Sequence, residues 1–400
     1  MSSSIGKFVV SDYPSLIKYM GSKSKIMDFV FEGINETYQG GIICDLFSGS
    51  GSLAGALRQQ CPVHSNDIQS YAGVLANTYN KAYKSLNMPT ADQLLNNAEE
   101  IYKRNKKSLG LQINFPKEIS LEDFNNQEEV QKKLINRQFK RDWHLFVKNY
   151  SGTWWSSDQC LWIDSIRQVA EEYSENPIYP TILSSLMFAM AYASQGTGHY
   201  AQYRDAKTES SMADILIYRK RDIPSYFRRK YYEILDWIPS KEPIYNHKVT
   251  ALDYSDCLSQ LNGGLVYADP PYCFVHYSRF YHALETLILY DYPELQIKAG
   301  KVVKGRYREE RHQSPFCIKS QVESSFKKLF NGVSNANSNL VLSYSNTGMI
   351  SLELLEEVAL EILHDYKIEI LTTDHKHMTL GRQNDRHRDV KECLIMAKRG

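Results

Sequence analysis

An apolar run that stops at two prolines constrains the fold of this chain more than any other feature. Residues 265–268 are all apolar or aromatic, and Asp269, Pro270, Pro271 and Tyr272 follow directly. A short apolar run bounded by a turn predicts a buried strand of a parallel sheet, which proline cannot continue. Ligands of open α/β sheets bind beyond the carboxyl ends of the strands, so this turn is predicted at a functional site. The alternative is an edge strand that ends in a solvated tyrosine.

The turn itself combines three chemically distinct groups. Pro270 and Pro271 have no N–H groups, so the carbonyl oxygens of the turn are acceptors held in a rigid backbone. Asp269 adds a carboxylate, and Tyr272 adds an aromatic ring. These groups suit an exocyclic amino group on a planar base, because the oxygens would hold the amino group while the ring stacks on the base.

A strand, a glycine-rich turn and a helix are predicted early in the chain. Residues 41–47 are strand-like, residues 48–52 alternate serine with glycine, and residues 53–57 begin a helix. This order lets a ligand approach bare backbone beside a helix N-terminus. No glycine stands three residues after Gly51, so the G-x-G-x-x-G pattern of dinucleotide-binding proteins is absent.

Asp67 follows a second predicted strand, residues 63–66, and lies about 18 residues after Gly49. A carboxylate at this distance suits the two hydroxyl groups of a ribose. Apolar residues recur at helical spacing from Ile68 to Leu86, so Asp67 is also a candidate helix N-cap. Both roles remain open from the sequence.

A third segment, residues 18–25, places a Gly-Ser turn between an aromatic residue and lysines. By itself it would be interpreted as a solvated basic turn. In combination with the features above, and in this order, it makes the chain resemble the Dam-like family of DNA adenine-N6 methyltransferases. The matching segments are residues 18–25, 45–52, 66–67, 253–254 and 268–272.

The resemblance implies an enzyme that transfers a methyl group from S-adenosylmethionine to the N6 amino group of an adenine flipped out of duplex DNA. The donor-binding residues that it implies are Tyr19, Lys23, Asp45, Phe47, Gly49, Gly51, Asp67, Asp253, Tyr254 and Asp269. The catalytic residues that it implies are Asp269, Pro270, Pro271 and Tyr272. Tyr19 stands where the family often has tryptophan, and Tyr254 where it has phenylalanine; both keep a stacking ring.

The predicted fold is α/β, with a Rossmann-like methyltransferase sheet that is mostly parallel. Residues 1–86 and 245–400 would form the two parts of the catalytic domain. Residues 87–244 are too many for a loop and predict an inserted, mainly helical domain, to which the resemblance assigns target recognition. A strand at 339–344 and a helix at 351–364 follow. Strands at 367–372 and 392–397 would form a closing antiparallel hairpin, whose polar loop includes Arg382, Arg386 and Arg388.

The net charge of +1 is too small for a protein that coats DNA, so contact with duplex DNA would depend on local basic patches. Two stretches mix cations with aromatic residues, which suits phosphate contact and base stacking. The DNA-binding residues predicted there are Arg219, Lys220, Arg228, Arg229, Lys304, Arg306, Arg308 and Arg311. Solvated helix faces or loops are the alternative. Trp154, Trp155 and Trp162 are interpreted first as packing residues and second as base contacts, and residues 195–200 form a loop without an assigned role.

Composition narrows the remaining possibilities. The seven cysteines lack C-x-x-C spacing, which favours reduced thiols in a cytosol over disulfides or a zinc site, so no metal is expected. Asp374, His375 and His377 are interpreted as part of a polar loop. No G-K-[ST] follows the glycines, so the usual loop of magnesium–phosphate chemistry is absent. No signal peptide or membrane-length apolar run is found, which predicts a cytoplasmic protein of a prokaryotic or phage-infected cell. No nuclease constellation is found, so any restriction endonuclease partner should be a separate chain.

Two other functional classes remain compatible with the sequence. The same turn would also hold an RNA adenine or the N4 amino group of cytosine. A catalytically idle nucleic-acid-binding subunit would keep the fold without transferring a methyl group, although intact Asp269, Tyr272 and the glycine-rich turn argue against it.

Overall fold

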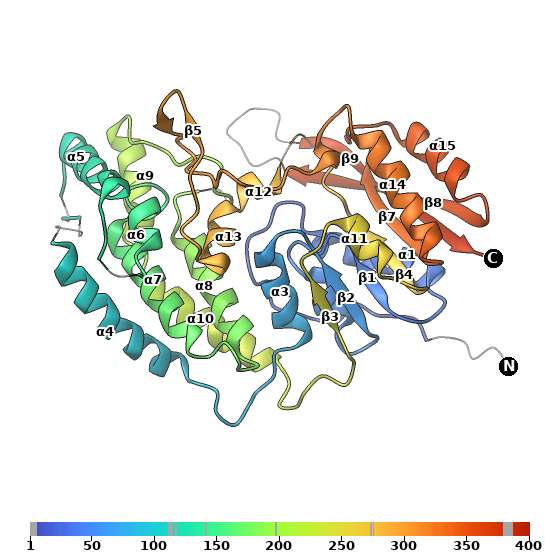
Figure 1. Ribbon diagram of the computed structural model, residues 1–400, viewed down its shortest axis with the longest axis horizontal. Helices are drawn as coiled ribbons and strands as arrows, with labels where there is room; N and C mark the ends of the chain where they lie inside the picture. The colour runs from blue at the N-terminus through green and yellow to red at the C-terminus, as the bar shows by residue number, and fades with distance from the viewer. Residues whose placement is uncertain are drawn as a thin grey trace.

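The computed structural model describes residues 6–110, 115–116, 118–140, 142–196, 198–272, 274, 276–378 and 387–400, without the side chains of 373–391. A seven-stranded sheet with the order β3-β2-β1-β4-β7-β9-β8 lies on the right of Figure 1. The strands are β1 (Ile43–Asp45), β2 (Val63–Asn66), β3 (Lys248–Thr250), β4 (Leu265–Ala268), β7 (Asn339–Ser345), β8 (Tyr366–Met378) and β9 (His387–Arg399). The first five in this order pair in parallel, whereas β9 is antiparallel to both β7 and β8. The predicted α/β sheet with a closing antiparallel hairpin is confirmed.

The closing hairpin is longer than the sequence predicts. The ladder between β8 and β9 continues from Tyr366↔Arg399 to Met378↔His387, well beyond the apolar residues that indicated the strands. Residues 374–377 and Arg388 therefore lie in strands, and their assignment to a polar loop is wrong. Backbone hydrogen bonds extend an antiparallel pair without regard to side-chain polarity, which explains the difference. Arg382 and Arg386 lie outside the described residues.

Alternating side chains of the sheet face two separate cores, as expected for strands covered on both faces. One core joins Ile43, Leu265 and Val341 to α1 (Met27–Thr37) and α2 (Ser52–Leu57). The other joins the neighbouring positions Cys44, Val266 and Leu340 to three helices on the opposite face. These helices are α11 (Tyr254–Ser259), α14 (Val322–Asn335) and α15 (Leu352–Ile362).

A helical region occupies the interval in which an insertion was predicted, and it lies on the left of Figure 1. Its helices are α4 (Ala91–Leu109), α5 (Leu121–Lys132), η2 (Lys133–Asn136), α6 (Leu145–Tyr150), α7 (Ser157–Glu171), α8 (Tyr179–Ala193), α9 (Glu209–Arg219) and α10 (Ile223–Trp237). Trp154 and Trp155 are fully buried there, and Trp162 stacks on Tyr102 with ring centroids 4.4 Å apart. These tryptophans are packing residues, as first interpreted. Among the described helices, none combines the length and hydropathy that crossing a membrane requires.

The helical region also includes a segment that we predicted, from the sequence, to belong to the C-terminal part of the catalytic domain. This segment contains α12 (Tyr277–Phe280), α13 (His282–Leu289) and the hairpin β5 (Ile297–Lys298) and β6 (Lys301–Val302). Leu284 and Leu287 of α13 share one core with Trp154 and Trp155. The same core includes Tyr71 and Leu75 from α3 (Ser70–Asn80), which therefore connects the helices to the sheet (Figure 1).

A carboxylate from the helical region caps the start of α3. Glu285 of α13 accepts hydrogen bonds from the backbone N–H groups of Ser70, at 3.0 Å, and Tyr71, at 3.1 Å. The N-cap residue of α3 is Gln69, whose side chain makes no capping bond. The suggestion that Asp67 is the N-cap is therefore wrong, because the cap comes from a residue far along the chain.

We expect Glu285→Ala to lower the free energy of unfolding by about 2 kcal/mol, because two N–H groups at a helix N-terminus lose a charged acceptor. Urea unfolding followed by circular dichroism measures the change. Glu294→Ala removes an exposed carboxylate from the segment after α13 and should change it by less than about 0.5 kcal/mol. Equal losses in the two variants would show that the contact with α3 contributes nothing.

Candidate active site

The sheet has its topological switch point between β1 and β4. The chain passes from β1 toward β2 on one side, while β4 pairs with β1 on the other. Asp45 ends β1 and is the register partner of Tyr267, two residues before Asp269. The two carboxylates therefore lie at the same edge of the sheet, where open α/β sheets bind their ligands.

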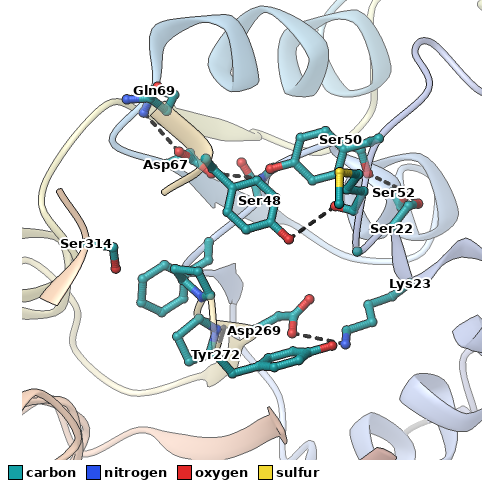
Figure 2. A pocket seen from close by; sticks show the side chains of 18 of the residues that line it. Ser22, Lys23, Ser48, Ser50, Ser52, Asp67, Gln69, Asp269, Tyr272 and Ser314 are labelled. Carbon is teal, nitrogen blue, oxygen red and sulfur yellow. Dashed lines mark hydrogen bonds and ion pairs between the residues drawn. The ribbon is translucent and has the colours of Figure 1, made fainter. Parts of the chain in front are cut away.

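A cavity of about 1380 Å³ opens at this edge. Lys23 and Asp269 lie at one end of the cavity in Figure 2, and Asp67 lies at the other. The serines Ser22, Ser48, Ser50 and Ser52 also line it. Of the predicted donor-binding and catalytic residues, all but Gly51 line the cavity. Gly49 and Tyr272, which are distant in the sequence, share it. The structure thus brings the predicted site residues together.

The glycine-rich loop requires glycine at Gly49 for two reasons. Its φ of +46° lies in the left-handed region, and a Cβ there would be 2.9 Å from the hydroxyl oxygen of Tyr19. The N–H of Gly49 donates to Oδ2 of Asp67 at 2.9 Å, and the N–H of Gln69 donates to Oδ1 at 2.9 Å. Burial raises the pKa of Asp67 to about 6, against the effect of these two bonds. Asp67 is thus a buried, oriented carboxylate on the cavity wall.

Asp45 adds a third carboxylate to the cavity wall. Burial, followed by the charges of Asp269 and Asp67, raises the pKa of Asp45 well above its usual value. In the described part of the chain, Oδ1 of Asp45 and Oγ of Ser48 are buried without a hydrogen-bond partner. Buried polar atoms of this kind need a partner, so a ligand that is cationic or donates hydrogen bonds fits here.

Lys23 lies between two carboxylates at the other end. Its Nζ is 3.2 Å from Oδ1 of Asp269 and 3.2 Å from Oε2 of Glu392 on β9. The hydroxyl of Tyr272 donates to Oε1 of Glu392 at 3.2 Å. Burial opposes the charge of Lys23, but Asp269 and then Glu392 outweigh it and raise the pKa of Lys23. Lys23, predicted to bind the donor, is therefore an ion-pair partner of the turn that begins at Asp269.

Aromatic residues line two further parts of the cavity. Tyr19 and Tyr277 line the cavity with ring centroids 5.5 Å apart, and the buried Tyr281 packs against both, at 4.8 Å from Tyr19 and 6.1 Å from Tyr277. Phe47 lies 5.9 Å from Tyr254 and 5.5 Å from Phe316. Nearby, Asp253 accepts from the N–H of Ser255 and caps α11.

Sequence reasoning missed four residues of this site, which are Glu392, Tyr277, Tyr281 and Phe316. Glu392 is fully buried, and its only sequence signal is a carboxylate at the start of an apolar strand. Tyr277 and Tyr281 follow the catalytic turn at helical spacing, which is a weak signal for a shared face. Phe316 follows a proline in a short 3-10 helix, η3 (Pro315–Cys317), and gives no signal that we can identify.

Three of the predicted DNA-binding arginines are buried and hold the protein together. Arg219 pairs with Glu128 at 2.6 Å and donates to the backbone carbonyl of Trp154. Arg306 donates to two backbone carbonyls, and Arg308 pairs with Asp291 on both carboxylate oxygens. Their assignment to a DNA-contacting surface is wrong, because a guanidinium with five donors also suits buried carbonyls and carboxylates.

The other five predicted DNA contacts remain accessible. Lys220, Arg228, Arg229 and Lys304 are exposed, and Arg311 is half-buried. Two of them have acidic partners: Arg228 is 2.9 Å from Asp92, and Lys304 is 2.5 Å from Asp205. Their contact with DNA stays a prediction. In the loop of residues 195–200, Tyr200 is buried, and Gly196 and Gly198 line the cavity.

Comparison with known protein families supports the interpretation of this cavity as the site of a methyltransferase. The profile of the D12 class N6 adenine-specific DNA methyltransferases matches residues 19–339. This chain belongs to that family. The resemblance to Dam-like adenine methyltransferases is thereby confirmed, and the match covers the helical region and strands β1 to β4 and ends where β7 begins.

Three relatives are methylases of bacteria. The chain is 22% identical to modification methylase LlaI of Lactococcus lactis over 96% of its own length and 55% of the relative. It is 24% identical to type II methyltransferase M.FokI of Planomicrobium okeanokoites, over 86% of the chain and 46% of the relative. It thus spans about half the length of these two. With M.NlaIII of Neisseria lactamica the identity is 21%, over 93% of the chain and 95% of the relative.

Proposed function

We propose that this chain transfers a methyl group from S-adenosylmethionine to the N6 amino group of an adenine in duplex DNA, as the modification enzyme of a restriction-modification system. The observation that carries the proposal is the single cavity that joins the glycine-rich loop to the Asp269–Tyr272 turn. Family membership and the modification methylases among the relatives support the reaction and its setting.

The residues of the cavity fit the donor. Asp67 would accept hydrogen bonds from the ribose hydroxyls, and Phe47, Tyr254 and Phe316 would contact the adenine ring. Asp45 would face the positively charged methionine portion, consistent with its unpaired oxygen. When bound, S-adenosylmethionine supplies an electrophilic methyl group attached to a sulfonium. The acidic lining suits this charge.

The catalytic turn would activate the target amino group. The amino lone pair is delocalised into the purine ring, so the nitrogen is a poor nucleophile. The Asp269 carboxylate and the Pro270 carbonyl would accept the two amino hydrogens and stabilise positive charge as it develops on nitrogen. Lys23 keeps Asp269 ionised and in place, through the 3.2 Å ion pair. Proton release after transfer would pass to Asp269 or to water.

The Tyr272 ring would stack on the flipped base. Extracting a base from a duplex costs a few kcal/mol, and stacking on an aromatic ring returns about 1–3 kcal/mol. The bond from the Tyr272 hydroxyl to Glu392 fixes the ring at the cavity edge. Glu392 thus acts as a positioning residue for both Tyr272 and Lys23.

The direct test uses S-adenosylmethionine with a radiolabelled methyl group. The full chain is incubated with duplex DNA, duplex RNA or no polymer, and labelled product is digested to nucleosides. We expect label in DNA, recovered as N6-methyldeoxyadenosine. Recovery as N4-methyldeoxycytidine, label in RNA alone, or donor binding without transfer would each contradict the proposal.

We expect Asp67→Asn to weaken binding of S-adenosylmethionine about 100-fold, because two ribose hydroxyls lose a charged acceptor. The donor-free variant should be about 1 kcal/mol more stable than the wild type at pH 8. The raised pKa means that ionised Asp67 costs stability above about pH 6, and this cost fades as the pH falls toward 4. The lost acceptor for one backbone N–H offsets part of the gain.

Isothermal titration calorimetry gives the affinity, and urea unfolding at pH 5 and pH 8 gives the stability. Asp236→Asn removes an exposed carboxylate and should leave both unchanged. An affinity within threefold of the wild type would remove Asp67 from the donor site.

A further inference from the structure

Three buried side chains with sulfur and nitrogen ligand atoms meet behind the donor site. Cys44 of β1 and His64 of β2 are register partners in the parallel ladder, so they lie side by side on one face of the sheet. Cys257 comes from α11, which covers that face. All three are at most 1% exposed. No part of the proposed reaction uses them.

Their ligand atoms are close together. Sγ of Cys44 is 3.9 Å from Sγ of Cys257, and the latter is 4.0 Å from Nε2 of His64. All three atoms lie within 4.8 Å of one another. A tetrahedral zinc ion, with bonds of about 2.3 Å to sulfur and 2.0 Å to nitrogen, needs about 3.8 Å between sulfurs and about 3.6 Å from sulfur to nitrogen. The observed sulfur–sulfur distance and the distance from Cys257 Sγ to His64 Nε2 each differ from these values by a few tenths of an ångström.

We propose that Cys44, His64 and Cys257 form a binding site for one thiophilic ion, Zn²⁺ or Cu⁺. Thiolate and imidazole are the ligands that these ions prefer. The Thr250 hydroxyl hydrogen-bonds to Nε2 of His64 at 2.8 Å and donates to Oδ1 of Asn66 at 2.7 Å, and in the zinc form it would exchange the bond to His64 for the fourth ligand position. In the three-coordinate form, which Cu⁺ accepts, that hydroxyl would not be a ligand. Binding displaces the thiol protons and the proton on Nε2, which pass to solvent.

The site lies directly behind the proposed donor-binding residues. Cys44 immediately precedes Asp45, and His64 lies on the strand that leads to Asp67. Cys257 belongs to α11, which Asp253 caps. An ion bound here would connect two strands and a helix, and would fix the backbone that presents all three carboxylates. This role rests on the proposed function, whereas the ion site itself does not.

The inference departs from the expectation that the chain has no metal site. That expectation rested on cysteine spacing along the sequence, and residues 44, 64 and 257 form no known spacing motif. The pairing of β1 with β2 and the placement of α11 create the cluster.

The test measures binding of the ion and uses no methyl transfer, so it fails or succeeds independently of the proposed function. The full chain is reduced, freed of metal with a chelator, and titrated with Co²⁺ as a spectroscopic substitute for Zn²⁺. In a second arm it is titrated with Cu⁺ against a copper-specific chelator. We expect about one ion per chain, with thiolate-to-cobalt charge-transfer absorption in the first arm.

Variants identify the ligands. Cys44→Ser and Cys257→Ser should each lower the affinity at least about 100-fold, and His64→Gln should do the same. Cys61→Ser, a buried thiol in a different core, should bind as the wild type does. If a serine variant does not fold, the wild-type charge-transfer spectrum and the His64→Gln variant still decide.

Three results would overturn the proposal. One is the absence of both cobalt charge-transfer absorption and Cu⁺ binding although all thiols are reduced, and another is unchanged affinity in all three ligand variants. The third is a disulfide between Cys44 and Cys257 that persists under the reducing conditions of the titration, so that no ion binds.

Discussion

Asp269→Asn is expected to reduce the rate of methyl transfer to DNA about a thousandfold. The amide keeps the size of the side chain but loses the charge that stabilises the developing positive charge on the amino nitrogen. Removing one such preorganised group in a buried site typically costs about 3–4 kcal/mol of transition-state stabilisation. Single-turnover transfer from labelled S-adenosylmethionine, with saturating DNA, measures the rate of the chemical step.

Two controls separate catalysis from folding in this variant. Asp365→Asn changes a carboxylate that is 71% exposed and should transfer at the wild-type rate. The Asp269→Asn variant should remain folded, because Lys23 keeps its ion pair with Glu392 and a like charge near Asp45 is removed; urea unfolding checks this. A transfer rate within tenfold of the wild type would show that this carboxylate is not catalytic.

Lys23→Met should strongly reduce transfer at neutral pH and lower the free energy of unfolding by about 3–5 kcal/mol. Lys23 is 8% exposed and pairs with Asp269 and Glu392, so its loss leaves two carboxylates buried without their cation. Their pKa values should then rise, and protonated Asp269 would no longer accept from the target amino group. Urea unfolding and transfer rates, each measured at pH 5 and pH 8, test both parts.

The pH dependence has a defined sign. In the wild type the pKa of Lys23 is raised, so its stabilisation is complete below about pH 10 and does not vary between pH 5 and 8. In Lys23→Met the carboxylates have raised pKa values, so the variant should lose stability as the pH rises from 5 to 8. Its residual transfer should increase over the same range, as Asp269 ionises.

A surface ion pair supplies the matched control. Lys103 is 65% exposed and pairs with Glu99 at 2.8 Å, so Lys103→Met should change stability by less than about 0.5 kcal/mol. Adding Glu392→Gln to Lys23→Met should recover part of the stability and none of the activity. If Lys23→Met is as stable as the wild type at both pH values, the buried ion pair does not have the assigned importance.

The sequence determined the parts of the site that depend on local patterns. Asp45 ends a short buried strand and Asp67 and Asp269 each follow one, and parallel strands present their carboxyl ends at one edge of a sheet. The glycine-rich loop and the double proline likewise depend only on neighbouring residues. These patterns and their order along the chain were sufficient for the fold class, the family and most of the predicted residues that line the cavity.

Only the tertiary structure decided which charged side chains are buried and which partners they meet. Arg219, Arg306 and Arg308 look like a basic surface in the sequence but satisfy interior carbonyls and carboxylates. Glu392 reaches Lys23 across 369 positions, and Glu285 caps α3 across 215. Burial and long-range contact arise from how distant elements pack, and side-chain type alone does not encode that packing.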